Sequence, residues 1–373
     1  MHSTIIISYE NNVLLWYHVA MEAEPFNVTV NPAAFSVVPP ASPSRTDKRL
    51  ARRAVWVLSF CCLCWGFSFP VAQFGLRAFE SHMPAGTADT LIAKLGVNAT
   101  FNGWRFALTA LFYGLLTFSS QRGFTRDEVK GGVLIGGFFS LGIFVQLAGL
   151  RYTLPSISSF LTALVVVFAP LAQALASLGR TQGRRPVGAW TWLAVCIALL
   201  GITILSQPDP CSMACNTVTS APPFPYMGEG LTILGSLFFT AQLLALDHYG
   251  RQADPARLTW IMFAVTAVLS TLMGVILSRG EIYSSRVILP LLNDHTLQWT
   301  ISSMVVFSSV VAVHLMIKHQ PRLSPATASV IYCLEPVFAT LFSLAFQTET
   351  ITAFTGLGGA MILLAVLIVA RKA

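Results

Sequence analysis

Long apolar blocks divide most of the chain, and short polar or charged segments separate them. Each block is about 20 residues long, the length that crosses a hydrocarbon core of roughly 30 Å. Because a backbone in lipid has no water to bond, each block is predicted to be a helix. The ten predicted helices span 54–78, 101–119, 130–149, 156–177, 187–206, 229–247, 258–278, 298–317, 324–346 and 351–370. The blocks lack the alternating polarity of an outer-membrane barrel, so an all-α membrane protein is expected.

Two segments depart from this pattern. Residues 1–52 mix apolar and polar positions, become rich in Pro, Ala and Ser, and then turn basic, which predicts a poorly ordered tail. The start has no basic residues before an apolar run, so a signal peptide is not expected, and Met21 offers a later initiation site. The long segment 79–100 is expected to carry a short amphipathic turn at 89–95.

Composition agrees with the membrane interpretation. The 373 residues are 54% hydrophobic and 10% charged, whereas a soluble domain carries about 25% charged residues. The formal net charge is +7, but the basic residues lie in short clusters between apolar blocks. A nucleic-acid-binding domain would gather them on one water-facing surface, so nucleic-acid binding is not expected.

The placement of the basic residues tests the number of spans. If the N-terminus is cytoplasmic, 17 of the 23 Lys and Arg residues lie at the cytoplasmic side. The other six are Arg77, Lys94, Arg105, Arg151, Arg279 and Arg286. This asymmetry follows the positive-inside rule, and it predicts ten spans in a plasma (inner) membrane with both termini cytoplasmic.

The two halves of the chain resemble each other. The segment SSFLTALVVVFAPLAQAL begins at Ser158 and SPATASVIYCLEPVFATL begins at Ser324, and each Ser lies twelve residues before a Pro. In this match Ala169 stands where Glu335 stands. A five-helix repeat is odd-numbered, so its copies must insert with opposite orientations, an arrangement typical of carriers. The predicted domains are the tail 1–52, a first repeat 53–207, an outer loop 208–228 and a second repeat 229–373.

An ordered set of motifs runs through these repeats. It comprises LCWGFSFPVAQFGL (63–76), WRFALTALFYGLL (104–116), LRYTLPSISSFLTALVVVFAP (150–170) and RLSPATASVIYCLEPVFATLF (322–342). With this set the chain resembles the EamA-type members of the drug/metabolite transporter superfamily over about 54–370. The resemblance implies a secondary carrier that exports small metabolites. The tail and the segment 79–100 depart from the family pattern.

Glu335 is the most informative ionisable residue, because it lies near the middle of the ninth predicted helix. A charge at that depth is costly unless it is paired, hydrated or neutralised. Pro336 follows it and frees a backbone carbonyl, which loosens the helix locally. Such a carboxylate is suited to take a proton or a cation in a coupled carrier. The equally weighted alternative is a structural carboxylate hydrogen-bonded to a neighbouring helix.

The other candidates are polar groups and prolines at membrane depth. Arg105 would pair with an anionic substrate, pair with Glu335, or extend to the lipid headgroups, and the last is favoured. Amide and ring side chains in hydrocarbon should face the bundle interior, where they line a path or join helices. They are Trp65, Gln73, Gln146, Gln173, Gln242, His314 and Tyr332, and the helix-breaking candidates are Pro70, Pro170 and Pro336.

Other patterns bear on cofactors, partners and modification. Five cysteines lie in apolar blocks as small core residues, and Cys211 and Cys215 share a loop in which they would pair under oxidising conditions. No metal site and no cofactor are expected. The pair Gly132 and Gly136 predicts close helix contact, and the glycines of the tenth helix leave a homodimer open. Asn98-Ala-Thr matches a glycosylation site on the outer side.

Several functions compete at this point. A secondary exporter of amino acids or related compounds, driven by protons, agrees best with the repeat and with Glu335. A nucleotide-sugar or sugar-phosphate exchanger would need Lys or Arg deep in the bundle, where only Arg105 is near. A non-transporting scaffold is the remaining alternative. An enzyme is not expected, because no nucleotide-binding or clustered catalytic motif occurs.

Overall fold

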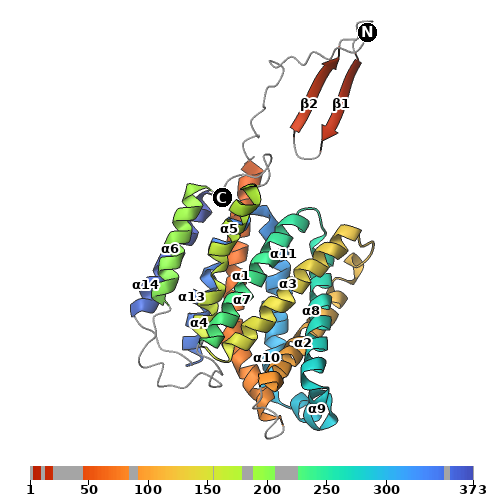
Figure 1. Ribbon diagram of the computed structural model, residues 1–373, viewed down its shortest axis with the longest axis vertical. Coiled ribbons are helices and arrows are strands. Elements are labelled where there is room, and N and C mark those ends of the chain that lie inside the picture. Colours follow the sequence, from red (N-terminus) through yellow and green to blue (C-terminus); the bar gives the residue numbers. More distant parts are fainter. Residues whose placement is uncertain are drawn as a thin grey trace.

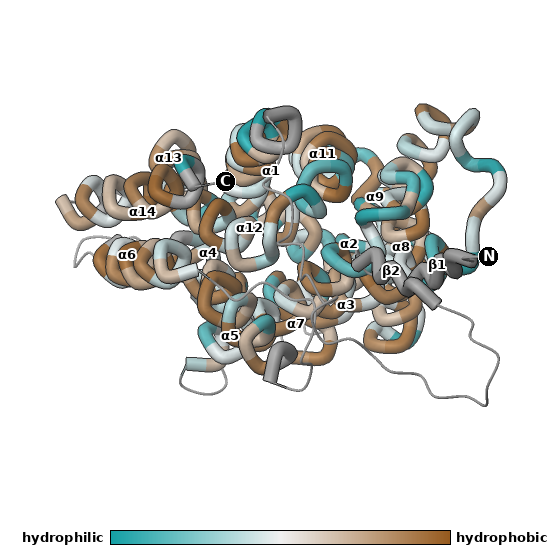
Figure 2. Tube along the Cα trace, turned by 90° about the horizontal axis from the view of Figure 1, so that it is seen from above, coloured by the Kyte–Doolittle hydropathy of each residue, from teal (hydrophilic) through white to brown (hydrophobic). Residues whose placement is uncertain are grey.

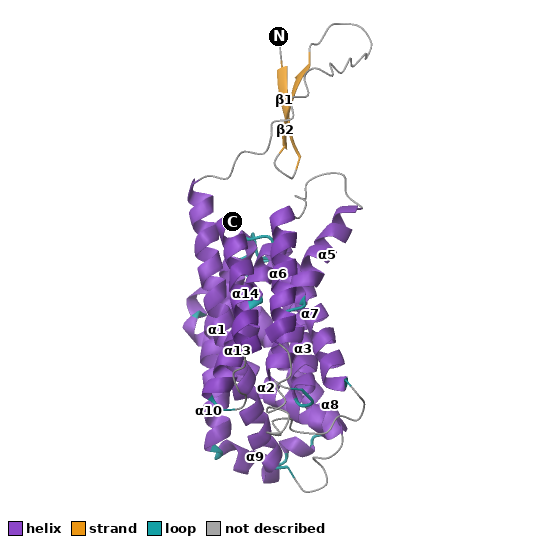
Figure 3. Cartoon of the chain, turned by 90° about the vertical axis from the view of Figure 1, so that its left-hand side faces the viewer, coloured by secondary structure: helices purple, strands orange, loops and turns teal. Residues whose placement is uncertain are grey.

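The computed structural model describes residues 3–9, 13–19, 45–83, 91–153, 155–178, 188–205, 226–347 and 353–372. These residues form a long helical bundle preceded by a two-stranded hairpin (Figures 1 and 3). The helices are α1 (Arg45–Ser81), α2 (Leu91–Leu116), α3 (Arg126–Leu150), α4 (Pro155–Thr162), α5 (Val165–Leu178), α6 (Ala189–Leu205), α7 (Met227–Tyr249), α8 (Pro255–Ser278), α9 (Ser285–Leu292), α10 (His295–Ser303), α11 (Ala312–His319), α12 (Pro325–Tyr332), α13 (Leu334–Ala345) and α14 (Ala353–Lys372). A π-helical turn, η5 (Met304–Val311), joins α10 to α11, and the short 3₁₀ turns are η2 (Phe118–Ser120), η4 (Glu281–Tyr283) and η6 (Gln320–Arg322).

The described residues make an integral multi-pass membrane protein. Seven of their helical segments are long and apolar enough to cross a membrane, and the segments 189–204 and 356–368 are shorter apolar helices. Many large apolar side chains are exposed on the bundle surface, among them Leu115 of α2 and Ile276 of α8. Such a surface suits contact with lipid tails rather than with water.

Each predicted block contains helix, but several boundaries differ from the prediction. The second helix begins at Leu91 rather than at 101, so most of the expected amphipathic turn at 89–95 belongs to α2. The fourth and ninth blocks are each divided, into α4 and α5 and into α12 and α13. The added helix α9 follows the seventh block.

Two parts of the predicted tail 1–52 have regular secondary structure. Strands β1 (Ser3–Tyr9) and β2 (Val13–Val19) pair antiparallel, with Ser3 opposite Val19. Both strands are rich in β-branched, aromatic and long aliphatic residues, which favour extended structure. Helix α1 begins at Arg45, inside the predicted tail. The Pro-rich part of the tail lies outside the described residues.

Pro70 and Pro170 do not break their helices as predicted. Helix α1 continues through Pro70, and α5 continues through Pro170. A proline removes one backbone hydrogen bond, and neighbouring groups in a bundle can make up for this loss. The breaks lie upstream, at Ala163–Leu164 and at Cys333, where backbone bonds shorten to the 3₁₀ pattern. Pro336 lies in the first turn of α13, just after its break.

The helix pairs in closest contact link the two halves of the chain. Helix α2 packs along α8, α3 along α7, and α6 along α14. Figure 2 shows α6 and α14 at one end of the bundle and α2, α8 and α9 toward the other. Helix α1 packs against α13 and against the segment from α10 to α11. The bundle is therefore built mainly from contacts between the predicted repeats rather than within them.

Small residues allow these close contacts, as predicted for α3. A side-chain carbon added to Gly132 would lie 2.6 Å from Cβ of Ile261, and one added to Gly136 would lie 2.9 Å from the Met262 carbonyl oxygen. Both contacts are with α8. The prediction that this glycine pair mediates helix contact is confirmed.

Gly136 and its neighbour Gly137 provide a matched test of this packing. Gly136→Leu should lower the free energy of unfolding by about 1–3 kcal/mol, because the new side chain overlaps the α8 backbone. Gly137→Leu should have little effect, since nothing lies within 4 Å of an added Cβ there. Thermal unfolding of the purified protein in detergent would measure both variants. Equal losses at the two positions would contradict the packing.

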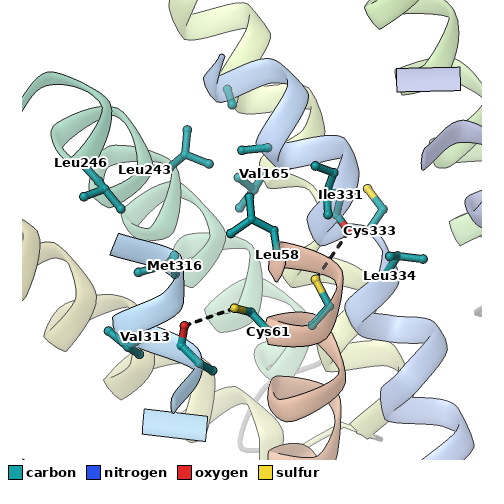
Figure 4. Close-up of a cluster of buried hydrophobic side chains, with 14 of the residues drawn as sticks. Leu58, Cys61, Val165, Leu243, Leu246, Val313, Met316, Ile331, Cys333 and Leu334 are labelled. Carbon is teal, nitrogen blue, oxygen red and sulfur yellow. Dashed lines mark hydrogen bonds between the residues drawn. The ribbon is translucent and has the colours of Figure 1, made fainter. Parts of the chain in front are cut away.

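The apolar core surrounds α1 near the middle of the bundle. Figure 4 shows Leu58 and Cys61 of α1 between α11 and the chain segment around Ile331. The Cys61 thiol donates to the Ala312 carbonyl at 3.3 Å, and the Cys62 thiol donates to the Ile331 carbonyl at 3.5 Å. Four of the five membrane-depth cysteines are buried as predicted, and Cys196 is exposed. Cys211 and Cys215 lie outside the described residues.

Candidate functional site: a polar cavity inside the bundle

A cavity of about 120 Å³ lies among α1, α2, α3, α4, α5, α7, α12, α13 and the segment from η5 to η6. Since one water needs about 10–15 Å³ of such space, the cavity has room for several waters or a small organic molecule. Six predicted site residues line it: Trp65, Arg105, Gln146, Gln242, Tyr332 and Glu335. The sequence-based prediction therefore brings together groups from α1, α2, α3, α7, α12 and α13.

Glu335 faces the cavity from the start of α13. The break at Cys333 places it in the first turn of the new helix, where unpaired backbone N–H groups favour a negative charge. The residue is half-buried, and within the described part of the chain its carboxylate makes no hydrogen bond and no ion pair. This geometry does not agree with the structural alternative, in which a neighbouring helix would hold the carboxylate. Glu335 therefore faces the cavity without a hydrogen-bond or ion-pair partner among the described residues.

Arg105 is held in the bundle interior, 5% exposed. Its Nε donates to Ser309 Oγ at 3.0 Å and its Nη2 donates to Ser308 Oγ at 2.6 Å. The favoured expectation, that Arg105 extends to the headgroups, is wrong. It assumed a helix that starts at 101, whereas α2 starts ten residues earlier and therefore places Arg105 near its middle. Neutral hydroxyls orient the guanidinium but leave its charge uncompensated, so it can attract an anionic group.

The two serines belong to the π-helical turn η5, which the sequence analysis did not predict. Such turns add a residue to a helix and are frequent at functional sites. Here the turn spans Met304–Val311 and places Ser308 and Ser309 in the interior opposite Arg105. The sequence does contain a signal for this site, because Ser308 and Ser309 are adjacent hydroxyl residues in an apolar block. The sequence-based prediction considered charged, amide and ring side chains and therefore missed it.

Aromatic and amide groups form the wall beside Glu335. The Trp65 and Tyr332 rings meet edge to face with centroids 5.5 Å apart. Trp65 Nε1 donates to the Ser308 carbonyl at 3.1 Å, and the Tyr332 hydroxyl donates to Gln320 Oε1 at 2.6 Å. Gln320 was also not predicted, because it lies after the eighth block. These bonds fix both rings, so the wall is preorganised.

The predicted amides divide between the cavity and helix contacts. Gln146 donates to Thr162 Oγ1 at 2.7 Å, and Gln242 approaches Met316 Sδ at 4.0 Å, both at the cavity wall. Gln73 does not line the cavity itself, but it donates to the carbonyl of the lining residue Leu150 at 3.5 Å.

Two further candidates also lie away from the cavity lining. Gln173 accepts a hydrogen bond from the backbone N–H of Ala326 at 3.2 Å, which joins α5 to α12. His314 Nδ1 lies 2.7 Å from the Tyr113 hydroxyl, which joins α11 to α2. Gln73, Gln173 and His314 therefore connect helices in this structure.

Asn98 does not have the environment expected of a glycosylated residue. It lies inside α2 and is 0% exposed, with its Oδ1 bonded to Arg151. Among the described residues, no cluster of three or more His, Cys, Asp or Glu side chains is placed to hold a metal ion.

Comparison with known proteins identifies the class of molecule. The sequence profile of the EamA-like transporter family matches residues 226–371. An uncharacterized transporter of Archaeoglobus fulgidus is 30% identical over 316 residues, which cover 84% of this chain and 85% of that protein. The chain belongs to the EamA-like transporter family. As an EamA transporter of the drug/metabolite type, it moves a solute across a membrane.

A solved structure has the same fold as this EamA transporter. It is a crystal structure of a protein, and it matches with a TM-score of 0.55 at 15% sequence identity. The match covers 88% of this chain and 99% of that chain. At this identity the likeness concerns the fold alone.

Proposed function

We propose that this EamA transporter is a secondary carrier that exports small polar metabolites, with Glu335 as its proton-coupling group. One observation carries the proposal: Glu335 lines the cavity and has no hydrogen-bond or ion-pair partner among the described residues. A free charge at membrane depth is costly, so a carboxylate without a partner there favours binding a proton or a cation. Its protonation would then be linked to the state of the cavity.

The helix contacts support an arrangement of ten spans in two inverted halves. Exchanging the halves, so that α1 takes the place of α7 and so on, turns the contact of α3 with α7 into that of α1 with the α10–α11 segment. It likewise turns the contact of α1 with α13 into that of α7 with α5, and the contact of α1 with α12 into that of α7 with α4. The pairs α2–α8 and α6–α14 map onto themselves, as pairs that join corresponding helices of the two halves must. We infer that both termini are cytoplasmic and that the protein lies in a plasma (inner) membrane.

The broken helices suggest a different register for the repeat from that of the sequence match. Helices α4 and α12 each begin with a proline, Pro155 and Pro325, run for eight residues and then break. Counted from these prolines, Glu335 corresponds to Val165 rather than to Ala169. Both Val165 and Glu335 line the cavity, whereas Ala169 does not. On this count the broken helices of the two halves follow the same course at the cavity. Among the described lining residues, the second half alone contributes a carboxylate, that of Glu335.

The charges of the cavity suit a zwitterion such as an amino acid. Arg105 offers a guanidinium that is bonded to neutral hydroxyls, and Glu335 offers an unpaired carboxylate. A substrate carboxylate would pair with Arg105 and a substrate ammonium with Glu335. If the ammonium and the proton compete for Glu335, binding of one releases the other, which couples export to proton entry.

The alternatives are weaker on specific grounds. A nucleotide-sugar or sugar-phosphate exchanger needs several cations for its phosphates. Among the described residues that line the cavity, Arg105 alone is a Lys or Arg. A non-transporting scaffold would need neither the cavity nor an unpaired carboxylate inside it.

Counterflow in liposomes tests the proposal directly. Purified protein is reconstituted into liposomes, which are loaded in turn with amino acids, sugars and nucleotide sugars. Uptake of the labelled compound from outside is then followed with and without a pH gradient. We expect counterflow of one or more zwitterions and a response to the gradient. Transport of nucleotide sugars alone would favour the exchanger, and counterflow of no compound would favour the scaffold.

A further inference from the structure

A buried ion pair lies at the face of the bundle opposite to the start of α1 and the end of α14, here called the opposite face. Arg151 follows α3, and its side chain, 1% exposed, pairs with Glu80 near the end of α1. Its Nε also donates to Asn98 Oδ1 of α2 at 2.6 Å. One guanidinium thus ties the ends of three helices together. We call Arg151, Glu80 and Asn98 the charged tie.

The charged tie lies next to the cavity. Leu150, the residue before Arg151, lines the cavity, and so do Leu147 of α3 and Ala72 of α1. The Leu150 carbonyl accepts a hydrogen bond from Gln73 at 3.5 Å. A solute that leaves the cavity between the ends of α1 and α3 would have to pass this layer.

The corresponding layer at the other face, here called the terminal face, is made of neutral groups. Gln320 lines the cavity, donates to the Leu243 carbonyl of α7 at 3.2 Å, and accepts from Tyr332. A Cβ added to Gly250 would lie 2.8 Å from Pro321 Cγ, so the chain segments touch there without side-chain polar groups. We call this layer the neutral tie.

One other ion pair, Arg251 Nη2 with Asp247 Oδ1 at 2.6 Å, lies at the end of α7 at the terminal face and does not line the cavity. Two further ion pairs brace the loops and do not border the cavity either. Arg257 Nη2 lies 3.1 Å from Glu128 Oε1 at the terminal face, and Glu128 also accepts from the backbone N–H groups of Thr125 and Asp254. His82 Nδ1 lies 3.7 Å from Asp294 at the opposite face. None of these residues lines the cavity. They connect neighbouring loops rather than separate the cavity from solvent.

We propose that the charged tie of Arg151, Glu80 and Asn98 is the gate of the opposite face, closed here, and that it must separate before the cavity opens to that side. This inference rests on the proposed carrier function. Opening the neutral tie breaks amide and phenol hydrogen bonds, whereas opening the charged tie separates opposite charges. The protein without substrate should therefore stay closed at the opposite face and open more readily at the terminal face.

The charge on Arg151 does not depend on pH near neutrality. Burial lowers the pKa of Arg151 to about 10, so the guanidinium stays protonated at pH 7. Because the pKa of Arg151 is lower in the folded protein than in the unfolded chain, folding favours the neutral form of this side chain. The difference affects the charge on Arg151 only as the pH nears 10. Between pH 6 and pH 8 the charge on Arg151 should stay constant, so a pH response of transport in that range does not arise from Arg151.

Hydrogen–deuterium exchange of the purified full chain in lipid nanodiscs, without substrate, tests the gate. Glu80→Gln keeps the size of the side chain but removes its charge. We expect about tenfold faster exchange in peptides covering 72–83 and 144–153, because local opening there becomes easier. Peptides covering 312–323 at the terminal face should exchange as in the wild type. Asn98→Ala should give a smaller change in the same direction.

Glu229→Gln is the matched control, since Glu229 lies in the first turn of α7 at the opposite face but outside the charged tie. Unchanged exchange in both Glu80→Gln and Asn98→Ala would overturn the gate. An equal rise at the two faces would also overturn it, because it would mean general destabilisation. This measurement needs no transported compound. If the wild type shows counterflow but exchange at the opposite face is unaltered in the variants, the gate alone is refuted. If the wild type shows no counterflow, that result refutes the carrier function alone.

Discussion

Replacing Glu335 with Gln should abolish the response of transport to a pH gradient while counterflow of the substrate continues at a reduced rate. The amide has nearly the same shape as the carboxylate but cannot take up or release a proton. Since Glu335 has no hydrogen-bond or ion-pair partner in the described structure, its neutral replacement leaves no opposite charge unpaired in the bundle. The fold should therefore survive, and the loss should be specific to coupling.

Proteoliposomes with an imposed pH gradient provide the measurement for Glu335→Gln. The Glu229→Gln variant is the control, because Glu229 lies in the first turn of α7 and does not line the cavity. A Glu335→Gln protein that still accumulates substrate in response to the gradient would remove Glu335 from the coupling mechanism. The carrier interpretation would then need another proton-binding group.

Replacing Arg105 with Gln should weaken the binding of carboxylate-bearing substrates by about 10- to 100-fold, the range expected for a charge-assisted hydrogen bond. Decarboxylated analogues should lose much less, because they have no group to pair with the guanidinium. Arg105→Lys should also bind poorly, since a point charge cannot span Ser308 and Ser309 as the planar fork does.

Binding to the purified variants can be followed by ligand-dependent thermal stabilisation across a substrate and analogue pair. Arg126→Gln, an exposed change at the first residue of α3, is the matched control for the loss of one positive charge. An equal loss for the acid and its decarboxylated analogue would show that Arg105 supports the fold rather than the substrate carboxylate.

The hydrophobic pattern predicted where helices occur but not how they begin and break. Block length follows directly from the thickness of the bilayer, so each predicted block contains helix. The start of α2 was missed because Lys94, Asn98 and Asn102 lower the hydropathy of its first turns. In the fold Asn98 and Asn102 are buried among neighbouring helices, so their polarity did not mark a loop. Tertiary contacts, which no local pattern contains, decided this boundary.

The cavity was partly predictable for a related reason. Polar groups in lipid must face inward, which correctly drew attention to Glu335, Trp65, Tyr332, Gln146 and Gln242. The same rule cannot tell a cavity from a helix contact, and Gln73, Gln173 and His314 proved to join helices. The partners of Arg105 depend on the π-helical turn, which adds one residue to a helix without a distinctive sequence.

We propose that two five-span halves, inserted in opposite directions, enclose this cavity. Epitope tags at residue 1 and at residue 373, each probed by an impermeant reagent in sealed vesicles of known orientation, test it most directly. An even number of spans predicts that both tags react from the same side, and the positive-inside rule predicts that this side is cytoplasmic. Tags that react from different sides would mean an odd number of spans, and the paired halves could not then enclose a cavity that opens alternately to each side.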